Sequence, residues 1–238
     1  MECLHERRIV SLKEIAVELG ISEITVRRDF EKLENAGKLK RVQGGAALEE
    51  YIDNAELSMK EKIPLHSQSK WVVAKRAAEL VNEGDCVFLD SGTSVAQTIG
   101  FLVDKKIIIV TNSQLVLRKV VNPKAAIHVI GGLFLPHHCM NVGPEAQEAL
   151  GKFRFDAAIF GCVGVENNMS YITTMDTLHI KEIAFANSAK NILLIDSSKL
   201  GKPSYLKFKE LDAFDKIICD APPDSKKSED KRIEFVSG

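Results

Sequence analysis

The sequence predicts an α/β protein in which a small N-terminal winged helix-turn-helix is followed by a larger α/β domain with a mainly parallel sheet. Three observations support this prediction. The first fifty residues show helical periodicity and end in a short glycine-tipped hairpin, a polar and aperiodic stretch follows, and from residue 69 onward helical stretches alternate with short apolar runs. We therefore expect a helix-turn-helix domain over residues 1–46, a linker over 47–68 with one helical turn, and the α/β domain over 69–238.

The composition is that of an ordinary globular protein and argues against several classes. Of the 238 residues, 45% are apolar and 27% are charged, and charges interrupt every apolar stretch, so neither disorder nor a transmembrane helix is expected. The N-terminus lacks the apolar core of a signal peptide. The 5 cysteines are scattered without a Cys-x-x-Cys pair, which argues against a disulfide framework or zinc ribbon and favours a reducing cytoplasm. Because the net charge is -1, nucleic-acid binding requires a local basic patch.

The larger domain follows from the order of its apolar runs. Strands are predicted at 86–89, 107–110, 127–130, 157–160, 192–195 and 216–219, with a last strand at 233–236. Helices are predicted at roughly 69–82, 94–103, 113–121 and 177–189. Because the strand runs are apolar throughout rather than alternating, we expect them to be buried on both faces, with the helices as crossovers of βαβ units.

The first helix of the small domain begins after Ser11. Its apolar residues recur at the spacing of one helix face, and Gly20 is expected to end it in the left-handed conformation. The residues of this face are Leu12, Ile15, Ala16 and Leu19.

A second helix follows at once, and Ser22 is expected to cap it, with Thr25 at its third position. Val26, Phe30 and Leu33 lie at i, i+4 and i+7 and are predicted to face the core. At 100° per residue the opposite face carries Ile24, Arg28 and Lys32, with Thr25 and Arg27 at its flanks. Two helices joined by a short glycine-containing turn, with basic residues exposed on the second, indicate a DNA-reading helix-turn-helix.

A basic hairpin follows the second helix. Residues 37–46 read as a strand, a Gly-Gly turn and a returning strand, and Lys38, Lys40 and Arg41 make this wing suitable for phosphate contacts. Without the wing, an exposed helix pair with ordinary surface charge would explain the pattern equally well. The candidate DNA-binding residues are Ser22, Ile24, Thr25, Arg27, Arg28, Lys32, Lys38, Lys40 and Arg41.

Polar turns follow several strands of the larger domain. Asp90-Ser91-Gly92-Thr93-Ser94 links a strand to a helix, and such a turn directs backbone N–H groups, hydroxyls and the helix dipole to one point, as an anion site requires. A tight turn with a Ser/Thr cap is the alternative.

Polar or glycine-rich ends recur at Thr111-Asn112, Gly131-Gly132 and 196–199, which ends in Lys199. Because the ends of parallel strands meet at one edge of the sheet, we expect a pocket for a small polar anion there. Lys181 could add a positive charge, although a solvated helix surface is equally compatible with a single lysine.

Residues 14–46 closely resemble the winged helix-turn-helix of DeoR-type bacterial transcriptional regulators. The most specific pieces are Thr-Val-Arg-Arg-Asp at 25–29 and Arg-Val-Gln-Gly-Gly-Ala at 41–46, where the family usually has histidine in place of Gln43. The family begins with a longer helix than residues 2–10 can form, so we expect a shortened first helix.

The resemblance extends over almost the whole chain. The matching pieces are 90–94, 111–112, 131–132, 142–143, 154–156, 173–174, Lys181 and 196–199. They resemble the DeoR-type sensor domain, which is similar to ribose-5-phosphate isomerase and binds phosphorylated sugars as inducers. The resemblance implies that residues 90–94 hold the phosphate and that Asn112, Gly131, Gly132 and Lys181 line the sugar. Val163 stands where the family has an acidic residue, and the stretch from Asp176 to Lys181 is about two residues short, so it remains open whether the effector is the family's typical one.

The resemblance implies a cytoplasmic regulator of carbohydrate metabolism, by default a repressor that binds operator DNA as a homo-oligomer (a dimer or tetramer) and responds to a phosphorylated sugar. No cofactor, metal or enzymatic activity is expected. Two alternatives remain: an isomerase-like enzyme with an appended DNA-binding module, and a regulator that has lost its ligand. Isomerisation requires a carboxylate that moves a proton between adjacent carbons, which Val163 cannot provide, and Glu166 is placed in a loop. His137-His138 is interpreted as part of a solvated loop without a third metal ligand.

Overall fold

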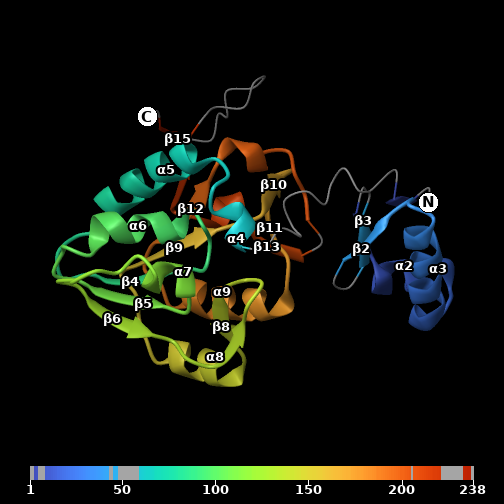
Figure 1. Cartoon of the computed structure of the whole chain (residues 1–238), viewed down its shortest axis with the longest axis horizontal. Coiled ribbons are helices and arrows are strands. Elements are labelled where there is room, and N and C mark those ends of the chain that lie inside the picture. The colour runs from blue at the N-terminus through green and yellow to red at the C-terminus, as the bar shows by residue number, and fades with distance from the viewer. Residues whose placement is uncertain are drawn as a thin grey trace.

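The computed structural model describes residues 3–4, 9–42, 45–47, 59–204, 206–220 and 233–236. It confirms the predicted fold class: a small unit whose described residues include helices α2 and α3 and three short strands, and a larger α/β unit built on a parallel sheet (Figure 1). The predicted shortened first helix falls mainly on residues outside these ranges.

The main sheet has seven strands, and every neighbouring pair is parallel. Their order is β15-β14-β12-β9-β4-β5-β6. The strands are β4 (Cys86–Leu89), β5 (Ile108–Thr111), β6 (Ala126–Val129), β9 (Ala157–Gly161), β12 (Asn191–Ile195), β14 (Lys216–Cys219) and β15 (Ile233–Phe235). Each predicted run therefore forms a strand, within one or two residues of its expected bounds.

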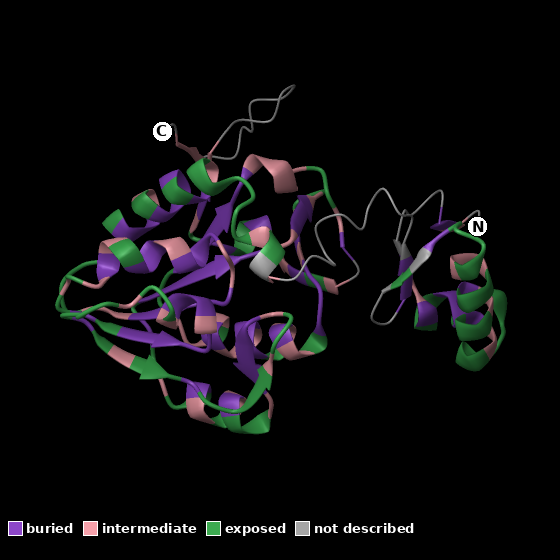
Figure 2. Ribbon diagram, viewed as in Figure 1, coloured by how far each residue is buried: buried purple, intermediate pink, exposed green. Residues whose placement is uncertain are grey.

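Helices cover both faces of this sheet. They are α5 (Ser67–Glu79), α6 (Val95–Leu102), α7 (Gln114–Leu117), α8 (Pro144–Gly151) and α9 (Met175–Ala186). Val87 and Leu89 of β4 pack in one apolar cluster with α5 and α6, whereas Phe88 packs in a second cluster with α8 and α9. Because successive residues of β4 face opposite sides of the sheet, the core has three layers: helices, sheet and helices. The buried central strands are purple in Figure 2. Helix α7 is shorter than predicted, and α8 was not predicted.

One strand departs from the predicted burial. The run at 127–130 was expected to be buried on both faces, but β6 is largely exposed, and Val129 retains 48% of its accessible surface. The reason is its position at the edge of the sheet, where one side of the strand has no neighbouring strand. The expectation was therefore wrong for β6, although the central strands fulfil it.

Several short elements lie beyond the main sheet and were not predicted. A three-stranded antiparallel sheet joins β10 (Gly164–Glu166), β11 (Met169–Ile172) and β13 (Leu206–Glu210), and a hairpin joins β7 (Leu133–Leu135) to β8 (Met140–Val142). Two single-turn helices, η2 (Ser197–Lys199) and η3 (Leu211–Ala213), follow β12 and β13. The expected helical turn of the linker is present as α4 (Met59–Lys62).

The small unit consists of β1 (Ile9–Ser11), α2 (Leu12–Leu19), α3 (Glu23–Asn35), β2 (Lys40–Val42) and β3 (Gly45–Ala47). Its antiparallel sheet has the order β1-β3-β2. Gly20 ends α2 with a left-handed φ of 64°, and the hydroxyl of Ser22 accepts a hydrogen bond from the Thr25 N–H at 3.2 Å, as predicted. Leu19 was expected in the core but is 57% exposed, because it is the last residue of α2 and the chain turns away at Gly20 directly after it. None of the described helices is long and apolar enough to cross a membrane.

Candidate functional site

The exposed face of α3 carries the side chains predicted to read DNA. Ile24 is 80% exposed, and Arg27, Arg28 and Lys32 are exposed with it, while Val26 is buried on the opposite side. The predicted orientation of the helix is therefore confirmed. Contact with DNA stays a prediction for each of these residues.

Ser22 and Thr25 form hydrogen bonds with each other at the start of α3. Their hydroxyl oxygens lie 2.9 Å apart, in addition to the capping bond from the Thr25 N–H. Thr25 is half-buried. Both residues can therefore fix the angle at which α3 is presented, which is a different role from reading a base.

The wing is connected to α3 through Arg41. Its Nε donates to Oε2 of Glu34 at 2.5 Å, and its backbone N–H donates to Oε1 at 2.9 Å. Lys38 is exposed. The side chain of Lys40 and the turn at 43–44 lie outside the described residues. Because a carboxylate already neutralises Arg41, Lys38 is the better placed of these two cations for a DNA phosphate.

A pocket opens at the carboxyl edge of the main sheet, where β4, β9 and β12 end. Of the residues predicted to bind an effector, it is lined by Asp90, Ser91, Gly92, Thr93, Lys181 and Lys199. The pocket has two adjoining parts that share Gly92, Cys162 and Val163. One part contains Lys199 and the other contains Lys181, so the parallel sheet brings these distant segments together.

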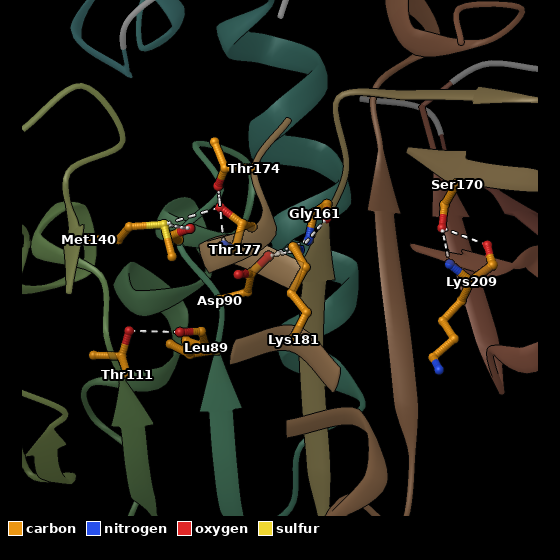
Figure 3. Close-up of polar contacts among 11 residues, drawn as sticks. Leu89, Asp90, Thr111, Met140, Gly161, Ser170, Thr174, Thr177, Lys181 and Lys209 are labelled. Atoms are coloured by element: carbon orange, nitrogen blue, oxygen red, sulfur yellow. Dashed lines mark hydrogen bonds and ion pairs between the residues drawn. The ribbon is translucent and has the colours of Figure 1, made fainter. Parts of the chain in front are cut away.

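Lys181 forms a buried ion pair with Asp90 in the second part (Figure 3). Its Nζ also donates to the carbonyl of Gly161 at 2.7 Å and lies 5.2 Å from the ring centre of Phe208. The N–H of Gly161 donates to the Asp90 carboxylate at 3.1 Å. The interpretation of Lys181 as a solvated surface lysine is therefore wrong. Since its ammonium group is already occupied, Lys181 shapes the wall of the pocket more than it attracts a ligand.

The other predicted residues lie beside the pocket and do not line it. The Thr111 hydroxyl donates to the carbonyl of Leu89 at 2.7 Å, and Asn112 Nδ2 donates to the carbonyl of Asn141 at 2.9 Å, so both hold neighbouring strands in place. Gly132 has a φ of 120°, and a Cβ there would lie 2.5 Å from the carbonyl oxygen of Val142, which gives this glycine a backbone role. Ser94 is buried at the start of α6, and Gly131 is exposed.

Several lining residues were missed by the sequence reasoning. The missed residues are Met59, Lys62, Leu65, His66, Lys70, His138, Met140, Ile172 and Thr177. Thr173, Asp196 and Ser198 also line the pocket, and they belong to the pieces 173–174 and 196–199 that the sequence did single out. Lys70 had a detectable signal, because it lies on the same face of α5 as Val73 and Ala77, where an apolar residue is expected. His138 is half-buried, so its interpretation as part of a solvated loop is wrong.

The first part of the pocket is rich in cations. Lys62, Lys70 and Lys199 all line it, with Asp196 as the acidic side chain beside them. Burial, followed by the charge of Lys199, lowers the pKa of Lys62 to about 8 and that of Lys70 to about 8. Burial alone would raise the pKa of Asp196, but the Lys199 ammonium at 3.4 Å and a hydrogen bond from Ser198 outweigh it and hold that pKa below its ordinary value. An anion bound here would relieve the repulsion among the lysines.

The second part is more neutral. Burial, together with His137 and Lys62, lowers the pKa of His138 to about 4, so this imidazole is uncharged near neutral pH. The Ser91 hydroxyl lies 3.3 Å from the sulfur of Met140, and the Thr174 and Thr177 hydroxyl oxygens lie 2.7 Å apart (Figure 3). Asp90 Oδ1 is buried without a hydrogen-bond partner. Hydroxyl-bearing ligands suit such a set of neutral donors and acceptors. Across the described residues, no three His, Cys, Asp or Glu side chains are grouped to hold a metal ion.

A winged helix-turn-helix joined to an α/β domain with a cation-rich pocket defines a DNA-binding regulator with a sensor for a small molecule. Two family models match this chain: the DeoR-like helix-turn-helix domain over residues 1–51 and the DeoR C-terminal sensor domain over residues 65–221. The chain belongs to the DeoR family of bacterial transcriptional regulators.

Curated relatives match the chain over nearly its whole length. The chain is 29% identical over 238 residues to a lactose phosphotransferase system repressor of Staphylococcus epidermidis, covering 98% of this chain and 95% of the relative. Proteins of the same name from Streptococcus mutans and Staphylococcus aureus are each 30% identical, over 94% of this chain and 90% of their own length.

Solved structures resemble only part of the chain. Ribose 5-phosphate isomerase A from Methanocaldococcus jannaschii aligns with a TM-score of 0.42 and 20% identity, covering 57% of this chain and 55% of the isomerase. The eIF2B beta subunit from Chaetomium thermophilum aligns with a TM-score of 0.44 and 17% identity, covering 63% of this chain and 50% of that subunit. Scores at this level carry no conclusion about this chain.

Proposed function

We propose that this protein is a repressor of genes for carbohydrate metabolism and that a phosphorylated sugar bound in the pocket controls its affinity for operator DNA. The curated relatives are named as repressors of a lactose phosphotransferase system, which supports both repression and a sugar-related effector. We place its action in the cytoplasm, where bacterial DNA lies. We also propose a dimer or a tetramer, because helix-turn-helix proteins read paired half-sites with paired subunits.

The cation-rich part of the pocket is the observation that carries this proposal. Lys70 and Lys199 line the same part of the pocket as Gly92 and Thr93, whose turn lies directly before the start of α6 at Val95. Lysine ammonium groups and a helix N-terminus are the features that bind phosphate in proteins. We therefore propose that the phosphate lies here, in agreement with the turn that the sequence singled out.

The sugar would then extend into the second part of the pocket. Ser91, Thr173 and Thr177 line it with neutral hydroxyls, and the buried carboxylate of Asp90 forms part of its wall with Lys181. Neutral polar groups discriminate among sugars because each hydroxyl of the ligand needs a partner in a defined direction. The identity of the sugar is therefore set in this part, and the affinity for any phosphate is set in the first.

A calorimetric titration of the full chain tests the proposal, with inorganic phosphate and a panel of pentose and hexose phosphates as probes. We expect at least one sugar phosphate to bind more tightly than inorganic phosphate and to release the protein from an operator selected from genomic fragments. Lys199→Met should weaken binding of every phosphorylated probe by about tenfold or more, since it removes one charge-assisted contact. The matched variant Lys202→Met, an exposed lysine of the same loop, should leave it unchanged.

The same titration distinguishes the two alternatives. Chemical turnover of a bound sugar phosphate would indicate the isomerase-like enzyme. Absence of binding by every probe, in a protein that still binds its operator, would indicate a regulator that has lost its ligand. Either result contradicts the proposed function.

A further inference from the structure

Helix α4 lies directly over the pocket, although it belongs to the segment that precedes the α/β domain in the chain. Met59 and Lys62, its first and last residues, both line the two parts of the pocket. The chain between β3 and α4 leads to the DNA-binding unit. A ligand in the pocket would therefore touch the helical turn that directly follows the connection between the two units.

Two polar contacts hold α4 against the pocket. The N–H of Met59 donates to the carbonyl of His137 at 3.1 Å, and Nζ of Lys70 donates to the carbonyl of Lys62 at 2.5 Å. The side chain of Met59 adds an apolar contact with the core cluster of α5 and α6. A helix of four residues is held by such contacts and not by its own stability, because isolated helices of this length do not persist in water. Its position is thus sensitive to whatever occupies the pocket.

The charges in the pocket act against this position when no anion is present. Lys62 comes from α4 and has Glu61 of the same helix as its acidic neighbour, whereas Lys70 and Lys199 come from the sensor domain and have Asp196 beside them. Repulsion between Lys62 and the other two lysines favours movement of α4 away from the pocket. A bound dianion outweighs that repulsion, because all three cations are then attracted to the same group.

We propose that Lys62 contacts the anionic group of the effector and that α4 closes on the pocket when the anion binds, so that Lys62 couples the sensor domain to the segment leading to the DNA-binding unit. This inference rests on the proposed function, since it requires a phosphorylated effector in this pocket. An effector can shift a conformational equilibrium only by its difference in affinity between the two states. The contact with Lys62 exists only when α4 is closed, and it supplies that difference.

Hydrogen exchange of the full chain, with and without a saturating probe, tests this inference. The probes are inorganic phosphate and the tightest-binding sugar phosphate of the panel. We expect the amides of Met59 and Ile63, which donate to His137 and to Met59 respectively, to exchange more slowly by roughly 5- to 150-fold when the probe is bound. Lys62→Met should bind the probe more weakly and should lose this protection.

Two further variants keep the test specific. Lys62→Arg preserves the charge and should restore both affinity and protection. Lys75→Met removes an exposed lysine of α5 that contacts Trp71, and it should behave as the wild type. If the wild type binds the probe and α4 exchanges at the same rate as before, or if Lys62→Met keeps the protection, the inference is wrong and the proposed function stands. If the wild type binds no phosphorylated probe, the proposed function fails and the inference fails with it.

Discussion

Lys181 of α9 and Asp90 at the end of β4 form an ion pair across 91 positions of sequence, with both side chains almost completely buried. The pair is completed by the backbone of Gly161 on β9, which accepts from Lys181 and donates to Asp90. The ends of β4 and β9 and helix α9 are thereby fixed around one charge pair (Figure 3). The pair defines the wall of the pocket, and its loss should affect the fold before it affects recognition.

Substitution of Lys181 by methionine should destabilise the protein by about 3–5 kcal/mol, because it leaves the buried carboxylate of Asp90 without its counter-charge. Urea unfolding of the full chain measures this. Lys209→Met is the control: it breaks a partly exposed pair with Glu182 and should cost less than about 1 kcal/mol. Equal losses for the two variants would show that the Asp90–Lys181 pair is not desolvated in solution.

Gly92 offers a way to block the phosphate without disturbing the turn. A Cβ at this position would lie 3.5 Å from both Gly161 Cα and Val95 Cγ2, which is ordinary contact. Gly92→Ala should therefore remain within about 0.5 kcal/mol of the wild type in unfolding experiments. Gly92→Leu should fill the junction of the two pocket parts and abolish binding of sugar phosphates while operator binding persists. If both variants release operator DNA at the same concentration of sugar phosphate as the wild type, the phosphate binds elsewhere.

The sequence was sufficient to predict the main sheet and much of the small unit. Runs such as 157–160 and 192–195 are apolar throughout, and Gly20 and Ser22 mark a helix end and a helix start by local chemistry alone. Several of the elements that were missed lack such local signals, although α8 begins at Pro144, a residue type favoured at the first helical position. Strands β7, β8 and β10 are three residues long, and they form only because neighbouring strands pair with them.

The pocket could be predicted only in part for a similar reason. The turn at 90–94 is visible in the sequence because Gly, Ser and Thr follow an apolar strand. The role of Lys181 is not visible, because its partner is distant in sequence and its burial depends on how α9 packs. Lys62 lies in a polar stretch that reads as a linker, and its contribution depends on α4 folding back over the sheet edge.

The salt dependence of DNA binding should distinguish the cations of the wing. Each lost phosphate contact lowers the slope of log K against log salt by about 0.9. Lys38→Ala is expected to show this full decrease, and the double variant Lys40→Ala/Arg41→Ala should also lower the slope. Arg41→Ala alone should show less, since Glu34 neutralises that guanidinium. Glu34→Gln provides the complementary test: it should raise nonspecific affinity, and a decrease would mean that Glu34 positions the wing for contact.

Binding of inorganic phosphate should weaken above about pH 8, because burial and the neighbouring lysine charges lower the pKa of Lys62 and of Lys70 to about 8. The anion gains negative charge, and loses none, as the pH rises, so its own titration cannot weaken the binding. The effect of rising pH on the stability of the ligand-free protein has the opposite sign. The unfolded lysines titrate near pH 10.4 and therefore bind more protons than the folded ones between about pH 8 and 10, so the ligand-free protein gains stability there as pH rises.

Thermal unfolding with and without phosphate across this pH range measures both effects. The stabilisation by phosphate should shrink as the pH rises, and Lys70→Met should remove a large part of that dependence. A phosphate effect that is constant through this range would show that neither Lys62 nor Lys70 contacts the anion.

Ile24 should determine sequence preference without contributing to general affinity. Its side chain projects from α3 opposite Val26, is 80% exposed, and can make only apolar contacts, for example with a thymine methyl group in the major groove. Ile24→Ala should therefore relax the preference at one base pair, by about 1–3 kcal/mol, and leave binding to random DNA almost unchanged.

Val26→Ala is the matched control, because the same truncation in the core should lower the stability of the small unit and weaken binding to both kinds of DNA. Competition between operator and random duplexes measures the ratio directly. Equal loss on both duplexes with Ile24→Ala would place this side chain in the packing of the domain, and the face of α3 assigned to base reading would then have to be redrawn around Arg28.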